Sequence, residues 1–96
     1  MSCSLSTHVL DTAAGKPAEG VAVELLSDGA AVGSAETDVD GRARLADDLP
    51  PGTYRLVFHP HSPFFTRVEL QVELAEGHYH VPLLVSPFGC ASYRGS

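Results

Sequence analysis

Apolar and polar residues alternate with a period of two along most of this chain. In segment 67–74, every even-numbered residue is valine or leucine, and every odd-numbered residue carries a charge or an amide. In segment 54–59, the even-numbered residues are tyrosine, leucine and phenylalanine, which places them on one face of an extended segment. Because successive side chains of a strand point to opposite faces, the pattern predicts β-strands that bury one face.

Residues typical of turns separate these segments. Ser-Asp-Gly at 27–29, Asp-Val-Asp-Gly-Arg at 38–42 and Ala-Glu-Gly at 75–77 each interrupt the alternation. The Asp-Gly pair at 40–41 supplies residues that tolerate a positive φ. Short strands between such turns predict an all-β antiparallel sandwich, and no window shows a convincing helical stripe. Without a repeat or a linker, residues 1–96 are expected to form a single domain.

Composition narrows the classes of function. The chain has 96 residues, of which 44% are hydrophobic and 19% charged, as in an ordinary globular domain. A formal charge of −6 with only six scattered basic residues argues against nucleic acid or an anionic membrane as partner. Residues 1–10 contain no basic segment followed by an apolar one, so no signal peptide is recognised and a cytoplasmic location is expected. The two cysteines are then expected to be free thiols.

Five histidines give the chain candidate chemistry, because imidazole changes its charge near neutral pH. His59 and His61, and likewise His78 and His80, are two residues apart, so each pair could share one face of a strand. Four imidazoles could in principle surround a zinc ion. Prolines interrupt the first pair, however, so His59 and His61 are expected to be solvated loop residues. Zinc binding remains an open alternative.

His80, His8 and Arg42 are the remaining candidates. In segment 78–86 the odd-numbered residues up to 85 are apolar, so His80 lies on the opposite, mixed face, which suits a cleft floor or an intersubunit surface. His8 takes a similar position in the expected strand 6–11. Arg42 directly follows the Asp-Gly turn. Taken singly, each residue fits a solvated surface position.

Several short motifs resemble one known family. They are Ser-Thr-His-Val-Leu-Asp-Thr at 6–12, Gly-Lys-Pro-Ala-Glu-Gly-Val at 15–21, Asp-Gly-Arg at 40–42, His-Tyr-His-Val-Pro-Leu-Leu at 78–84, Ser-Pro at 86–87 and Tyr-Arg-Gly-Ser at 93–96. Together they resemble the transthyretin-related 5-hydroxyisourate hydrolases over nearly the whole chain. Such a set is far more specific than a single short motif.

The resemblance implies a fold, an assembly and a reaction. The fold would be a sandwich of two four-stranded sheets, and the assembly a homotetramer with sites between subunits. The family's usual short helix would be missing, because segment 60–65 is short here. The reaction would be hydrolysis of 5-hydroxyisourate to 2-oxo-4-hydroxy-4-carboxy-5-ureidoimidazoline in urate degradation, without metal or organic cofactor. The residues implied are His8, Arg42, His80 and Ser96 as catalytic groups, with Arg42, Tyr93 and Arg94 binding substrate.

The chemistry of these residue types agrees with such a reaction. His8 and His80 would form a base and acid pair, in an order that the sequence leaves open. Arg42 would hold the substrate and its developing negative charge. The hydroxyl and terminal carboxylate of Ser96 would orient an imidazole or a polar group of the substrate. Two alternatives are a non-catalytic transthyretin-like module that binds a small ligand, and a structural β-sandwich with zinc on its histidines.

Overall fold

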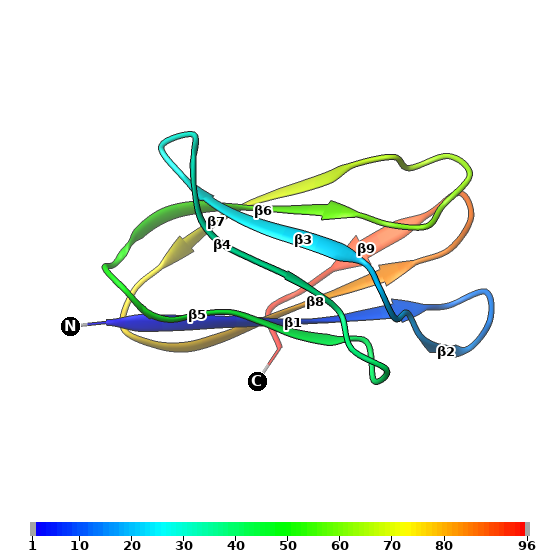
Figure 1. Cartoon of the computed structure of the whole chain (residues 1–96), viewed down its shortest axis with the longest axis horizontal. Helices are drawn as coiled ribbons and strands as arrows, with labels where there is room; N and C mark the ends of the chain where they lie inside the picture. The colour runs from blue at the N-terminus through cyan, green and yellow to red at the C-terminus, as the bar shows by residue number, and fades with distance from the viewer. Residues whose placement is uncertain (1, 96) are drawn as a thin grey trace.

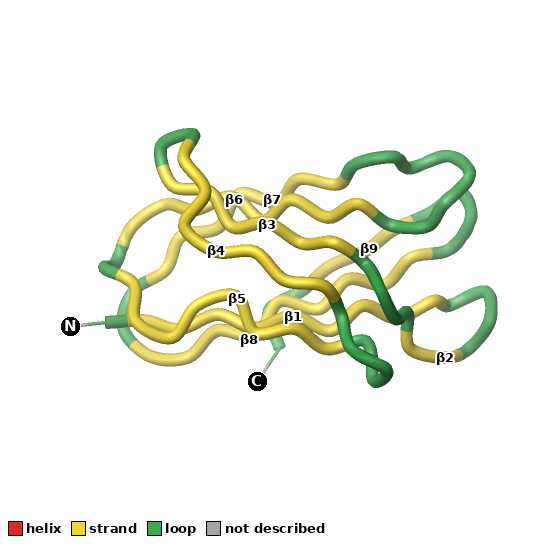
Figure 2. The backbone as a smooth tube through the Cα atoms, viewed as in Figure 1, coloured by secondary structure: helices red, strands yellow, loops and turns green. Residues whose placement is uncertain are grey.

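The computed structural model describes residues 2–95, which form nine β-strands in two packed layers (Figure 1). The strands are β1 (Cys3–Asp11), β2 (Lys16–Pro17), β3 (Ala22–Ser27), β4 (Ala30–Glu36), β5 (Arg42–Leu49), β6 (Gly52–His59), β7 (Val68–Leu74), β8 (Gly77–Val85) and β9 (Cys90–Ser92). Figure 2 shows these strands joined by loops, with no helix within residues 2–95. The expected all-β sandwich and the missing helix are therefore confirmed. It follows that no helix in this part of the chain could span a membrane.

The two layers are a five-stranded and a four-stranded sheet. The first has the order β2-β1-β8-β9 with β5 also paired to β1, and the second has the order β4-β3-β6-β7. The first sheet exceeds the expected four strands because β5 and β2 share one edge of β1: β5 pairs with residues Cys3 to His8, and β2 with Leu10 and Asp11. The two central strands, β1 and β8, run parallel, whereas all other pairs are antiparallel.

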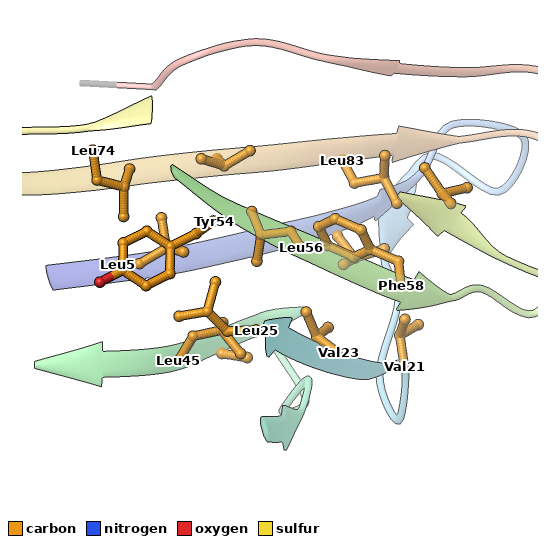
Figure 3. Close-up of a cluster of buried hydrophobic side chains, with 14 of the residues drawn as sticks. Leu5, Val21, Val23, Leu25, Leu45, Tyr54, Leu56, Phe58, Leu74 and Leu83 are labelled. Atoms are coloured by element: carbon orange, nitrogen blue, oxygen red, sulfur yellow. The ribbon is translucent and has the colours of Figure 1, made fainter. Parts of the chain in front are cut away.

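The alternating apolar residues meet between the sheets, as Figure 3 shows for Leu5 of β1, Leu25 of β3 and Phe58 of β6. Each of these three side chains is completely buried. The inward face expected for β6 is confirmed, because Tyr54 and Leu56 are buried in the same cluster. Full burial of one such large side chain contributes about 1.5–3 kcal/mol, so this cluster is the main stabilising feature of a thin sandwich.

Two expected strand limits differ from the observed ones. β1 begins at Cys3 rather than at residue 6, because Cys3 and Leu5 continue the buried alternation. β7 begins at Val68, so residues 60–67 are a loop. In this loop the Ser62 hydroxyl accepts the backbone N–H groups of residues 64 and 65 and donates to the carbonyl of Pro87. These bonds satisfy backbone groups that a strand would otherwise pair, and they hold the short connection in place.

Both cysteines are free thiols, as expected, with Cys3 buried and Cys90 exposed. Burial, reinforced by the charge of Asp48, raises the pKa of the Cys3 thiol. Cys3 therefore acts as a small apolar core residue.

Candidate active site

Three of the predicted residues lie on the outer face of the first sheet. His8 points outward from β1 because its neighbours Thr7 and Val9 are buried. Arg42 begins β5 and is exposed, whereas the next residue along the strand is buried. His80 of β8 precedes the buried Val81 and is itself half-buried. The strand alternation thus turns all three side chains to the same side of the sheet.

The strand register brings these residues close together. His8 lies directly opposite Arg42 in the antiparallel β1–β5 pair, and in the parallel β1–β8 pair His80 lies beside Ser6, one outward position from His8. The ring centroids of His8 and His80 are 6.4 Å apart, and the ring planes are tilted by 41°. Arg42 and His80 also line one open hollow of about 570 Å³. The structure therefore gathers two imidazoles and a guanidinium in one place.

Gly41 fixes the turn that delivers Arg42. The carbonyl oxygen of Gly41 accepts the backbone N–H of Val9 at 2.7 Å, which ties the turn to β1. Gly41 has a φ of 75°, and a Cβ atom there would lie 2.4 Å from the Val9 carbonyl oxygen. No real Cβ approaches an oxygen that closely, so only glycine allows this contact. The Asp-Gly-Arg sequence places Arg42 opposite His8 for this reason.

A chain of hydrogen bonds holds His80 from the side of β1. The Ser6 hydroxyl lies 2.8 Å from Nδ1 of His80 and 3.0 Å from Nε2 of His78, and the Ser4 hydroxyl lies 2.6 Å from Nδ1 of His78. The sequence reasoning missed Ser4, Ser6 and a role for His78. A usable signal existed, because Ser4 and Ser6 precede His8 at even positions and so share its face.

The environment of His80 lowers its pKa. Burial is the largest cause, followed by the positive charge of Arg42 and then by His8 and His78. All of these disfavour the protonated ring. His80 is therefore neutral over a wider range of pH than a free imidazole, which is the state that a proton acceptor needs.

The C-terminal tail passes directly beside His80. The backbone N–H of Gly95 donates to the carbonyl oxygen of His80 at 2.7 Å, and a Cβ at Gly95 would lie 2.8 Å from Cδ2 of that ring. Ser96, which the sequence predicts as a catalytic residue, lies outside the described residues, and its role stays a prediction. The tail thus reaches the site through its backbone.

Tyr93 and Arg94 are not brought into the hollow that Arg42 and His80 line. They line a second hollow of about 450 Å³ beside β7. The Arg94 guanidinium lies over the ring of Tyr79, 4.2 Å from its centroid, a cation–π contact that anchors the tail. Their predicted part in substrate binding stays a prediction.

The structure separates the two histidine pairs that could have formed a zinc site. His59 ends β6 in the second sheet, whereas His78 and His80 lie on β8 in the first. A site of four imidazoles is therefore wrong for this chain. His59 is also not the loop residue that was expected, because it ends β6, and its Nε2 atom lies 3.0 Å from a carboxylate oxygen of Glu24. Among the described residues, no three His, Cys, Asp or Glu side chains are placed to hold a metal ion.

Comparisons with known proteins agree on one family. The Transthyretin family model, described as HIUase/Transthyretin family, matches residues 5–95. The chain is similar to a 5-hydroxyisourate hydrolase of Caulobacter vibrioides, with 45% identity over 112 aligned positions that cover 96% of this chain and 97% of the relative. A similar relative in Mesorhizobium japonicum, also a 5-hydroxyisourate hydrolase, is 41% identical and covers 96% of this chain and 91% of its own.

Solved structures give the same result. The 5-hydroxyisourate hydrolase of Klebsiella pneumoniae superposes with a TM-score of 0.90 at 36% identity, covering 98% of this chain and 99% of its own. A sea bream transthyretin in complex with thyroxine superposes with a TM-score of 0.83 at 28% identity. The superposition covers 95% of this chain and 93% of the transthyretin chain. The alignment with the Caulobacter protein spans more positions than this chain has residues, so the relative carries insertions that are absent here.

Proposed function

This chain belongs to the HIUase/transthyretin family, and we propose that it is a 5-hydroxyisourate hydrolase that acts in urate degradation. It is a cyclic amide hydrolase that opens the ring of 5-hydroxyisourate to form 2-oxo-4-hydroxy-4-carboxy-5-ureidoimidazoline. The observation that carries the proposal is the grouping of His8, Arg42 and His80 on one face of the first sheet. The near-complete coverage of the hydrolase relatives supports it.

His80 serves as the general base in this proposal. Its lowered pKa keeps the ring neutral, and the Ser6 hydroxyl holds its Nδ1 atom, which directs Nε2 toward water and substrate. His80 removes a proton from the attacking water, and the oxygen of that water forms a bond to the ring carbonyl carbon. Proton transfer to a positioned side chain is worth about 10²–10⁴-fold in rate.

Arg42 and His8 complete the reaction. The guanidinium of Arg42 stabilises the negative charge that develops on the carbonyl oxygen, a contribution whose loss typically costs about 3–4 kcal/mol of transition-state binding. His8, opposite Arg42 in the strand register, donates a proton to the departing ring nitrogen. The carbon–nitrogen bond then breaks, and the ring opens. Ser96 would orient an imidazole or a polar group of the substrate, and Tyr93 and Arg94 would help to bind it.

We propose further that the enzyme is a homotetramer with its sites between subunits. The site of a single chain is an open hollow on an outer sheet face, and Arg42 is exposed there. A second copy over this face would exclude water and strengthen the electrostatic contacts. Sedimentation equilibrium should then give a mass four times the 10.1 kDa of one chain. A monomer that turns over substrate at full rate would contradict this assembly.

A non-catalytic, transthyretin-like binding module is the second candidate. Both the higher identity and the higher TM-score of the Klebsiella hydrolase, compared with the sea bream transthyretin, favour the hydrolase. A binding module would hold a small ligand in fixed stoichiometry without turnover.

The deciding experiment generates 5-hydroxyisourate with a urate oxidase and follows its decay spectroscopically with and without this protein. The wild-type protein should accelerate the decay, and His80→Ala and His8→Ala should each lower kcat at least about a hundredfold. His61→Ala is a matched control, because this histidine lies in the loop between β6 and β7. Wild-type turnover in either site variant, with an unchanged melting temperature, would refute the assignment of that residue.

A further inference from the structure

Three side chains outside the catalytic trio form one continuous row with His80. Along it lie Ser4, His78, Ser6 and His80, joined by contacts of 2.6 Å, 3.0 Å and 2.8 Å. The row zigzags between two parallel strands in which Ser4 lies beside His78 and Ser6 beside His80. Because the backbone register sets these neighbours, the row is a fixed feature of the sheet.

Exposure differs between the two imidazoles of the row. His80 and Ser6 are half-buried, whereas His78 is exposed. The two imidazoles are thus joined through one hydroxyl, with one ring at the reaction site and the other in contact with solvent. The roles given above for His8, Arg42 and His80 leave Ser6 and His78 without any part in proton movement.

The hydroxyl between the rings constrains their protons. A serine hydroxyl carries one proton, so Ser6 can donate to only one of the rings while it accepts from the other. If the Nδ1–H of His80 donates to Ser6, then Ser6 donates to Nε2 of His78, and Nε2 of His80 keeps its lone pair. If Ser6 instead donates to Nδ1 of His80 and accepts from Nε2–H of His78, neutral His80 carries its proton on Nε2 and can act as an acid. The row therefore links the base form and the acid form of His80 to which ring nitrogen of His78 carries the proton.

We propose that Ser6 and His78 form a proton relay for His80, in which His78 holds the proton between the attack of water and the later steps. This inference rests on the proposed hydrolase function. His80 Nε2 takes a proton from water, its Nδ1 proton passes to Ser6, and the hydroxyl proton of Ser6 passes to Nε2 of His78. The positive charge then lies on His78, whose Nδ1–H donates to Ser4. The reverse transfer returns the proton to Nδ1 of His80, whose Nε2 then releases its proton to solvent, and His8 regains from solvent the proton that it gave to the ring nitrogen.

The charges around the row favour proton transfer from His80 to His78. Arg42 and His8 lie beside His80, and both oppose a positive charge on that ring. The ionisable groups that face the row or line the same hollow are His8 of β1, Glu36 of β4, Asp38 of the turn, and Arg42 and Arg44 of β5. Arg44 is paired with Asp47, which offsets part of its charge. A proton on the exposed His78 is better solvated than one on the half-buried His80.

The test uses substitutions along the row in the full-length protein. Ser6→Ala removes the connecting hydroxyl, Ser6→Thr keeps it with a residue that strands accept, and His78→Gln keeps a polar side chain that cannot take up a proton. Outer partners that orient an imidazole at metal sites are worth about 10–100-fold, and we expect a loss of kcat in that range for Ser6→Ala and His78→Gln. Ser6→Thr should restore most of the rate. His59→Gln is the control, because it removes an imidazole of the second sheet.

Two readouts separate a relay from a structural role. In His78→Gln, kcat should rise with the concentration of imidazole buffer, which can accept the proton, whereas kcat of the wild type should not. In ¹⁵N-histidine spectra of the free protein, Ser6→Ala should change the tautomer ratio of His80, and His59→Gln should not. Wild-type kcat in Ser6→Ala, or buffer-independent kcat in His78→Gln, would overturn the relay. Absence of turnover in the wild type would instead overturn the hydrolase function, and the spectra would still decide whether Ser6 couples the two rings.

Discussion

Replacing Gly41 by alanine should damage both the fold and the reaction, because this glycine joins the turn to β1. An alanine at a φ of 75° pays about 1–2 kcal/mol for the left-handed backbone. Its Cβ would lie 2.4 Å from the Val9 carbonyl oxygen, so the turn must move away from β1. That movement breaks the 2.7 Å bond from the buried Val9 N–H, at about 1–3 kcal/mol. The sum is a destabilisation of about 2–5 kcal/mol, reduced slightly by the lower entropy of the unfolded alanine chain.

Gly29→Ala provides the matched control. Gly29 has a φ of 80° at the tip of the β3–β4 hairpin, and a Cβ there would meet nothing within 4 Å. This variant should lose only the free energy that the left-handed backbone costs an alanine, about 1–2 kcal/mol. At equal protein concentration, urea unfolding should show the difference, and Gly41→Ala should melt roughly 5–20 °C below Gly29→Ala.

The activity of the same two variants tests the positioning of Arg42. Displacing the turn moves the guanidinium away from His8, and a misplacement of about 1 Å can cost about a hundredfold in rate. We therefore expect a large loss of kcat in Gly41→Ala and wild-type kcat in Gly29→Ala, measured well below both melting temperatures. Equal stability and equal activity of the two variants would refute the reasoning from the close contact.

Three further predictions follow from contacts already described. Because Arg42 lowers the pKa of His80, Arg42→Gln should raise it and move the acid limb of the kcat/KM profile to higher pH; an unmoved limb would mean that His80 is not the titrating base. Gly95→Ala should fold normally but lower kcat about tenfold or more, since its Cβ would lie 2.8 Å from the ring of His80; steady-state kinetics with an unchanged melting curve check this. Thr37→Val should lower the free energy of unfolding by about 1–3 kcal/mol, because it removes the hydroxyl that accepts the buried N–H of Val21 at 2.9 Å; urea unfolding measures the loss.

The alternation of residues was sufficient to predict the strands at 54–59, 67–74 and 78–86 and their inner faces. In β7 the expected inward residues Val68 and Leu74 are buried, and in β8 Val81 and Leu83 are buried as well. The outward direction of His80 follows from the same alternation. Local patterns of this kind are readable because each depends only on which face of its own strand is apolar.

The pairing of strands was not readable in the same way. β1 and β8 lie more than sixty residues apart in sequence, yet their parallel register decides that Ser6 meets His80. No local pattern contains this register, so the row of hydrogen bonds behind His80 could not be predicted. The same holds for the tail, in which Gly95 pairs with His80 and the exposed Arg94 lies over the ring of Tyr79 instead of lining the hollow that Arg42 and His80 share.

The same register couples the core to the site. In β1, Leu5, Thr7 and Val9 point into the sandwich, while Ser6 and His8 point to the outer face. A slip of one residue would therefore exchange a core residue for a site residue at every position. Thr7 is a completely buried polar residue in this strand, and its hydroxyl donates to the Val81 carbonyl oxygen at 2.6 Å. A slip of two residues would keep Thr7 on the inner face but move its hydroxyl away from the Val81 carbonyl oxygen, so this bond favours the register that places Ser6 beside His80.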